Sequence, residues 1–132
     1  MRPSTILATI LSVSSLAFAA EKSIRRSELP PAVEKALQQQ VKGATIKGIT
    51  RDTENGRLVY EAELIVEGHT KDLQFDANGT FQEIEEEVSF DSLSPHVKAA
   101  LTAKAKGGTV RKVESLRKKD KLVAYAAQID RG

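Results

Sequence analysis

The chain has 132 residues, with 20 Lys and Arg against 18 Asp and Glu, no Cys, and 5% aromatic residues. This length suits one domain or two small repeats, and the lack of Cys excludes disulfides and cysteine-based metal or thiol chemistry. A net charge of +2 without an aromatic-rich basic stretch predicts no nucleic-acid partner.

Residues 1–19 have the pattern of a secretory signal peptide. Arg2 precedes an apolar run, and the small residues Ala17 and Ala19 indicate cleavage after Ala19. The run is too short for a membrane span, although an uncleaved interfacial anchor is an alternative. We therefore expect a periplasmic or secreted protein with no membrane span in its mature part, held together by its core without disulfides.

Residues 20–28 are polar and are expected to form a flexible lead-in. After them the sequence repeats at a distance of 64 residues, since residues 29–50 and 93–114 are identical at eight of 22 positions. Residues 29–92 are predicted to form a first repeat, and residues 93–132 a partial second repeat. Each is predicted to open with a short helix, the first between Pro31 and Gly43 and the second between Pro95 and Gly107.

Four strands are predicted after the first helix, over Thr45–Arg51, Leu58–Glu67, Thr70–Phe75 and Thr80–Val88. The dipeptide Asn55-Gly56 predicts a tight hairpin turn between the first two. Phe81 and Ile84 break strict alternation, which indicates a bulge in the fourth. The predicted fold class is α+β: a helix followed by a four-stranded antiparallel meander, and then a helix with a two-stranded hairpin.

The second repeat stops early. Aligning Tyr60 with Tyr125 requires one inserted residue in the second hairpin, and residues 68–88 then have no counterpart. Either the chain is incomplete at its carboxyl end, or the last strand has an open edge that the first repeat or another molecule completes. Such an edge would allow a homo-oligomer.

Several short motifs of the first repeat are distinctive: Leu29-Pro-x-x-Val-x-x-Ala-Leu37, Gly43-Ala-Thr-Ile46, Val59-Tyr60-Glu61, the turn at Gly68, and Phe75-Asp-x-x-Gly79. In these motifs the sequence resembles the PepSY-like family, which is related in fold to the β-lactamase inhibitor proteins. The resemblance implies an exported protein of helix-and-meander repeats that binds or inhibits exported proteins such as peptidases. It implies no catalytic residue and no cofactor.

Catalytic chemistry is not predicted. His69 follows Gly68 in an expected turn and His96 lies in the first turn of a helix, so both are expected to be ordinary exposed residues. No metal-binding histidine motif and no glycine-rich phosphate loop occur in the sequence. We expect a non-enzymatic protein; a hydrolase that uses carboxylates is the remaining enzymatic alternative.

Carboxylates instead mark a candidate binding surface. Alternation places Glu61, Glu63 and Glu67 on the outward face of one strand, and Glu85 on the same face of another. These four residues are the predicted partner-binding site. A solvated face and a Ca²⁺ site are the alternatives, although a flat strand arranges oxygens poorly around Ca²⁺.

Charge is also divided along the chain. Residues 52–92 carry twelve acidic and two basic residues, whereas residues 96–132 carry ten basic and three acidic residues. This division keeps a small protein soluble, or it brings the basic hairpin Arg117–Lys121 against the acidic sheet of a neighbouring molecule or an anionic surface. The predicted function is non-covalent binding of an exported protein or peptide; a small-ligand or Ca²⁺-responsive envelope sensor is the alternative.

Overall fold

A computed structural model of the chain describes residues 9–11 and 21–131. It divides the chain into two compact units. We call described residues 21–86 the N-terminal unit, and described residues 9–11 and 87–131 the C-terminal unit. Most of the predicted signal peptide falls outside the described residues, so its cleavage stays a prediction. Within the part of the chain that is described, no helix has the length and apolar character needed to cross a membrane.

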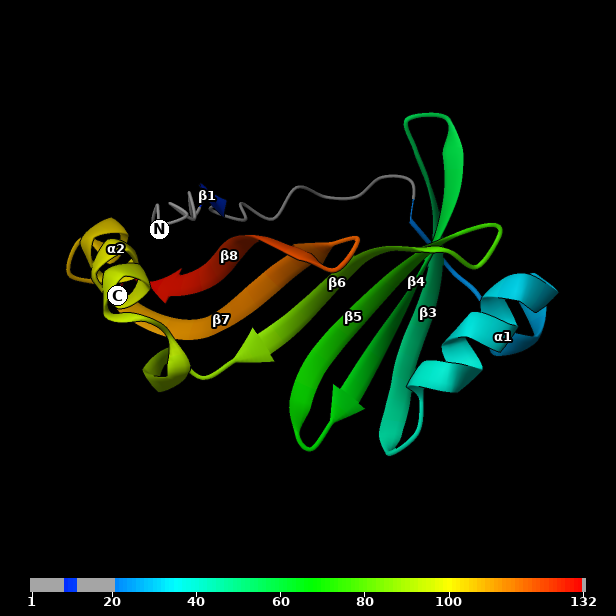
Figure 1. The fold of residues 1–132 in the computed structure, drawn as a ribbon, viewed down its shortest axis with the longest axis horizontal. Helices are drawn as coiled ribbons and strands as arrows, with labels where there is room; N and C mark the ends of the chain where they lie inside the picture. The colour runs from blue at the N-terminus through cyan, green and yellow to red at the C-terminus, as the bar shows by residue number, and fades with distance from the viewer. Residues whose placement is uncertain (1–8, 12–20, 132) are drawn as a thin grey trace, which may run out of the picture. The chain divides into compact units, whose positions relative to one another are not determined.

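The N-terminal unit contains the predicted helix and meander (Figure 1). The four long strands pair with one another in chain order, and each pair is antiparallel. A short additional strand pairs with the first of them. The elements are β2 (Lys22–Ser23), the 3-10 helix η1 (Arg26–Glu28), α1 (Pro31–Gln40), β3 (Ala44–Glu54), β4 (Arg57–Val66), β5 (His69–Asp76) and β6 (Phe81–Val88), whose last two residues belong to the C-terminal unit.

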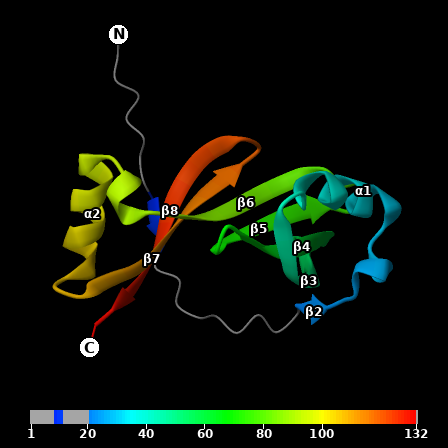
Figure 2. The same ribbon diagram turned by 90° about the horizontal axis from the view of Figure 1, so that it is seen from below.

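Helix α1 lies on one side of this meander, as Figure 2 shows. Pro31 suits the first helical turn because its fixed φ is pre-organised for a helix. Val33 and Leu37, four residues apart, fall on one face and are each only 1% exposed. They pack against strand residues that include Leu64 and Phe75, so this side of the sheet forms the core of the unit.

The predicted turn and bulge are both present. Asn55 and Gly56 have φ of 50° and 77°, the left-handed region that a two-residue hairpin turn requires. In β6, Phe81 pairs with Phe75 and Glu83 pairs with Gln74, so Gln82 is an extra residue. The extra residue brings Phe81 and Ile84 to the same side of the sheet, where both pack on the core.

The described residues of the predicted lead-in, 21–28, include β2 and η1, and the flexibility of this segment stays a prediction. The backbone N–H of Arg25 donates to Glu28 at 2.7 Å, and the Arg26 guanidinium binds the Glu34 carboxylate of α1 at 2.7 Å. The backbone N–H of Ile24 donates to the Ile49 carbonyl at 3.0 Å. The polar composition of this segment therefore reflects ion pairs and strand pairing that join it to the rest of the unit.

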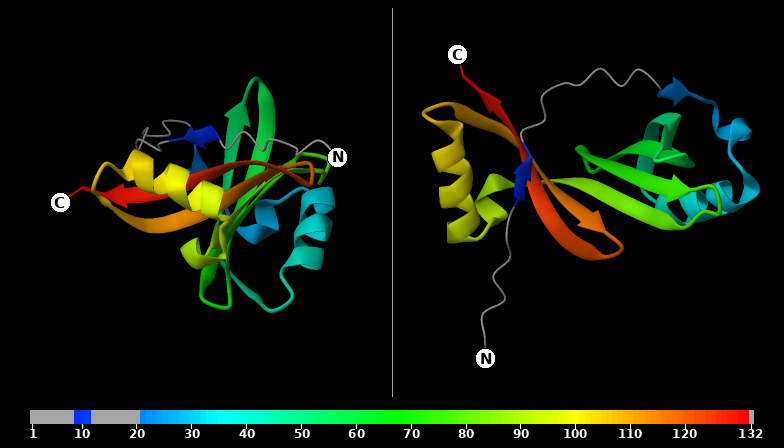
Figure 3. Two further views of the ribbon diagram at one scale, coloured as in Figure 1. Left: turned by 60° about the vertical axis from the view of Figure 1, so that its left-hand side comes forward. Right: turned by 90° about the horizontal axis from the view of Figure 1, so that it is seen from above.

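The C-terminal unit contains a second helix and hairpin, which Figure 3 shows from two sides. In α2, Val97 and Leu101 pack on Val113 and Tyr125 of the hairpin. The Ser94 hydroxyl accepts a hydrogen bond from the Val97 N–H at 3.3 Å and caps the helix. The elements are η2 (Phe90–Ser92), α2 (Pro95–Ala105), β7 (Thr109–Lys118) and β8 (Lys121–Asp130), and the three-residue strand β1 (Thr9–Leu11) pairs with β8 in parallel.

The strand register supports the internal repeat. In the first hairpin Tyr60 pairs with Arg51, and in the second Tyr125 pairs with Ser115, which is 64 positions after residue 51. Closer to the turn, Leu116 pairs with residue 124 and Arg117 with residue 122, so Val123 is the extra residue. The insertion predicted from the sequence is therefore a bulge within β8, beyond the turn itself.

A second bulge recurs at the same spacing. Lys47 is the extra residue in β3, and Arg111, 64 positions later, is the extra residue in β7. Each bulged cation pairs with a carboxylate of the neighbouring strand, Lys47 with Glu63 and Arg111 with Asp130. The helix and hairpin thus recur in detail, whereas the layout of one complete and one partial repeat stays a prediction.

Candidate binding face

The side of the β3–β6 meander opposite α1, which we call the outer face, is acidic. Alternation sends apolar residues of β4 and β5 toward α1 and their polar neighbours to the outer face. The strand register then places Glu63, Asp72 and Glu85 directly opposite one another on three adjacent strands. Like charges in opposite positions destabilise a sheet, so this arrangement costs folding free energy.

Three of the four predicted site residues lie on this face. Glu61, Glu63 and Glu85 are all partly buried there. The position predicted for Glu67 is wrong: β4 ends at Val66, and Glu67 is an exposed turn residue with φ of 50°. The adjacent Gly68 shares a positive φ of 81°, so the chain reverses here instead of continuing as a strand.

Sequence reasoning missed Asp72 as a member of the face. Asp72, Gln74 and Asp76 alternate with the core residues Leu73 and Phe75 along β5, and this alternation indicates that Asp72 lies on the outer face. The same alternation carries Gln74 into a row with Glu61 and Glu83 of the neighbouring strands.

A hollow of about 300 Å³ opens on the outer face. Six of its nine lining residues carry carboxylates and none is Lys or Arg, so the hollow has a strongly negative potential. Its apolar lining residue, Val59, is only 9% exposed although it lies on the side away from α1. The lining residues are Glu21, Thr50, Asp52, Glu54, Val59, Glu61, Gln74, Glu83 and Glu85.

The neighbouring carboxylates affect the pKa of Glu61. Burial, together with the nearby carboxylates of Asp72, Glu21, Glu85 and Glu83, raises the pKa of its carboxyl from the usual 4.5 to about 7. At neutral pH the folded protein therefore holds Glu61 in an environment that resists its ionisation. A nearby cation would lower this pKa and relieve the penalty.

Glu63 is different, because a cation already lies beside it. The Nζ atom of Lys47 lies 3.1 Å from Oε1 of Glu63, and both side chains are substantially exposed. Lys47 reaches this carboxylate from the bulge in β3. An exposed pair of this kind contributes about 0–1 kcal/mol to stability. Its main effect is to reduce the negative potential at this end of the face.

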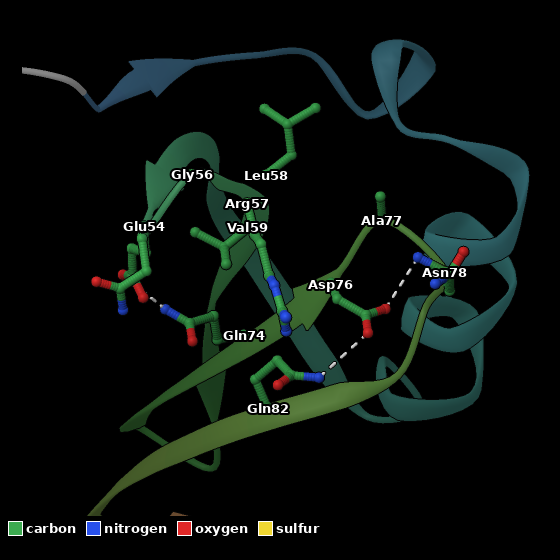
Figure 4. Close-up of a pocket in the computed structure, with 11 residues that line it drawn as sticks. Glu54, Gly56, Arg57, Leu58, Val59, Gln74, Asp76, Ala77, Asn78 and Gln82 are labelled. Atoms are coloured by element: carbon green, nitrogen blue, oxygen red, sulfur yellow. Dashed lines mark hydrogen bonds between the residues drawn. The ribbon is translucent and has the colours of Figure 1, made fainter.

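A second hollow, of about 850 Å³, adjoins the first at the ends of the strands (Figure 4). Arg57 extends into it between Gln74 and Asp76. The Gln74 amide donates to Glu54 at 3.1 Å, and the Gln82 amide donates to Asp76 at 3.3 Å. These bonds fix the carboxylates on the wall of the hollow.

The two hollows share the lining residues Glu54, Val59 and Gln74, so they form one continuous depression that we call the acidic groove. At its edge lies Leu58, which is 44% exposed and is the most exposed large hydrophobic side chain within residues 21–131. The acidic groove therefore combines negative charge with a small apolar surface, a combination that suits a polypeptide ligand.

The two histidines lie outside the lining of the acidic groove. His69 begins β5 and His96 lies in the first turn of α2, and both are exposed. Carboxylates in rows on one sheet face present oxygens from one side, whereas Ca²⁺ takes six to eight oxygen ligands from several directions.

Comparison with known proteins identifies the fold. No protein-family model matches the sequence, and no curated protein matches it either. Among solved structures, a DUF2874 family protein from Bacteroides ovatus aligns over 78% of this chain and 72% of its own, with a TM-score of 0.58 and 19% identity. A BLIP-like protein from Bacteroides fragilis aligns over 79% and 73%, with a TM-score of 0.56 and 23% identity.

A third solved structure, from Bacteroides thetaiotaomicron, is named as a proposed calcium-regulated periplasmic protein. It covers 84% of this chain and 97% of its own at 13% identity, and its TM-score of 0.43 is too low to carry an argument. The PepSY-like part of the sequence resemblance stays a prediction. The two stronger similarities support the other part, and the chain has an α+β fold of the BLIP-like type.

Proposed function

We propose that this protein is an exported, non-enzymatic binding module whose acidic groove holds a cationic segment of another exported protein. The observation that carries the proposal is the hollow with six carboxylates, no Lys or Arg, and Val59 in its lining. A partner Lys or Arg could place its charge among the carboxylates while its methylene groups cover Val59.

The energetics of the groove favour such a partner. Ionised Glu61 is disfavoured in the free protein, where desolvation and four neighbouring carboxylates oppose its charge. A bound cation would remove part of this cost, so its binding free energy would include the relief of repulsion already present. Groups held at a cost to stability are more typical of function than of folding.

Export is part of the proposal and rests on the pattern of residues 1–19. The BLIP-like fold is compatible with protein binding, although folds of one type host unrelated functions. The assignment therefore rests on the groove. Inhibition of an exported peptidase is a specific form of this proposal that the family resemblance implies.

The test is affinity capture from an envelope extract, with the mature chain as bait and elution in steps of increasing salt. The informative variant is Glu61→Lys, and the matched control is Glu67→Lys, which makes the same charge change in an exposed turn. We expect Glu61→Lys to lose the captured protein and Glu67→Lys to retain it. Equal capture by the native chain and Glu61→Lys would refute the role of the groove.

A further inference from the structure

The charges of this chain are complementary to one another. Most of the acidic groove comes from residues 52–92, which include twelve acidic and two basic residues, whereas residues 96–132 include ten basic and three acidic residues. A chain with one acidic and one basic segment attracts other copies of itself when the acidic segment of one molecule meets the basic segment of another. Self-association is therefore an outcome that the charge distribution favours.

The β7–β8 hairpin concentrates cations at a narrow tip. Lys119 and Asp120 form a two-residue turn, with φ of 47° and 64°, between strands that end at Lys118 and begin at Lys121. Together with Arg117, these five consecutive residues are all exposed and carry four positive charges against one negative. A hairpin tip is slender, since paired strands lie about 4.8 Å apart.

The groove and the tip carry opposite charges. The hollow among the carboxylates has no cation in its lining, and the adjoining larger hollow has only Arg57. The Lys and Arg side chains of the tip are long enough to reach charged groups while their stems contact Val59 at the groove surface.

We propose that the acidic groove of one molecule receives the β7–β8 hairpin tip of a second copy. This inference rests on the proposed function, because it names the partner of the same site. Groove and tip are different surfaces, so the contact is heterologous and can continue from one molecule to the next. The charges of the tip are exposed, as are Glu21 and Glu54 of the groove, and high salt should therefore dissociate the assembly.

Sedimentation velocity of the mature chain tests the proposal at low and high salt. At about 0.01 M salt, where the Debye length is about 30 Å, we expect dimers and larger species. At about 1 M salt, where it is about 3 Å, we expect monomers. A native chain that is monomeric in both conditions would overturn the proposal.

Two double variants test the contact itself. Glu61→Lys with Glu83→Lys changes the net charge of the residues that line the smaller hollow from −6 to −2, and Lys119→Glu with Lys121→Glu changes that of the tip from +3 to −1. Each variant alone should be monomeric at low salt. An equimolar mixture, however, pairs the intact tip of the first with the intact groove of the second. We expect the mixture to form one-to-one dimers that do not grow further, and a mixture that stays monomeric would contradict the proposal.

A charge-matched control separates the contact from a change of net charge. Glu67→Lys with Asp91→Lys adds the same charge as the groove variant at two exposed positions outside the groove, and it should still self-associate. Thermal unfolding followed by circular dichroism checks that every variant is folded.

The capture experiment distinguishes this inference from the proposed function. If the native chain stays monomeric while Glu61→Lys still abolishes capture of another exported protein, the groove is a binding site but a second copy of the chain is not its ligand. If Glu61→Lys changes neither self-association nor capture, both proposals fail.

Discussion

Replacing Glu61 with Gln should stabilise the protein at neutral and alkaline pH and leave it nearly unchanged in acid. In the unfolded chain this carboxyl ionises around its usual pKa of 4.5, whereas in the folded chain it stays protonated up to about pH 7. Between these values the folded state holds more protons than the unfolded state, so stability falls as pH rises. Above pH 7 the full penalty is present, and Gln avoids it because it has no charge.

The magnitude follows from the size of the pKa shift. At 1.36 kcal/mol per pKa unit, the change from 4.5 to about 7 corresponds to about 3 kcal/mol. Glu61 is only partly buried, and solvent screening reduces the expected gain to about 1–2 kcal/mol. The Gln variant should therefore unfold at a higher temperature than the native chain at pH 8, by about 4–8 °C, and at nearly the same temperature at pH 4.5.

Urea denaturation from pH 4.5 to 8.5 measures this effect directly. Glu67→Gln is the matched control, because it removes the same charge from an exposed turn outside the groove. A difference between Glu61→Gln and the native chain that is equal at pH 4.5 and pH 8 would refute the reasoning. Such a result would mean that Glu61 ionises as freely in the folded chain as in the unfolded one.

Three further substitutions test the fold. Leu64→Ala, at a position with no exposed surface, should cost about 2–5 kcal/mol in urea denaturation, and a cost below 1 kcal/mol would contradict its place in the core. Gly79→Ala should destabilise by more than about 1 kcal/mol, because φ is +80° and a Cβ atom would lie 2.8 Å from the carbonyl carbon of Ala32; an unchanged melting temperature would exclude this close approach. Ser94→Ala should cost about 0.5–2 kcal/mol by removing the cap of α2, whereas Ser94→Asp should retain most of the stability if capping is the cause.

Local sequence signals predicted much of the fold. Asn55-Gly56 marks a hairpin because both residues tolerate positive φ, and the structure has that turn. Phe81 and Ile84 could share the core only with an extra residue between them, and Gln82 is that residue. The alignment of Tyr60 with Tyr125 as equivalent positions of the repeat is reproduced in the strand register. The first two signals depend only on residues that are close together in the sequence.

Two features of the structure were not predicted, one for a local reason and one because it depends on a distant contact. Glu67 continues the alternation of β4, but the strand ends one residue earlier, at the turn with Gly68. The lead-in is polar in composition, and Arg26 forms an ion pair with Glu34 in a helix further along the chain. Composition alone does not reveal such pairings.

The site was predictable as a face but not as a groove. Alternation placed Glu61 and Glu85 together, because it depends only on strand period. The burial of Val59 and the raised pKa of Glu61 depend on how adjacent strands align, which the sequence did not specify. The crowding that makes Glu61 distinctive was therefore visible only in the structure.

The most direct test of the claim that the acidic groove is the binding site is NMR spectroscopy of the ¹⁵N-labelled mature chain. The chemical shifts of its backbone amides are followed during titration with a synthetic peptide of residues 114–124, which contains the hairpin tip. We predict shifts that cluster at groove residues such as Thr50, Val59, Glu61 and Gln74, that disappear in Glu61→Lys, and that persist in Glu67→Lys. Shifts confined to the α1 side of the sheet, or unchanged by Glu61→Lys, would contradict the account of the acidic groove as the binding site.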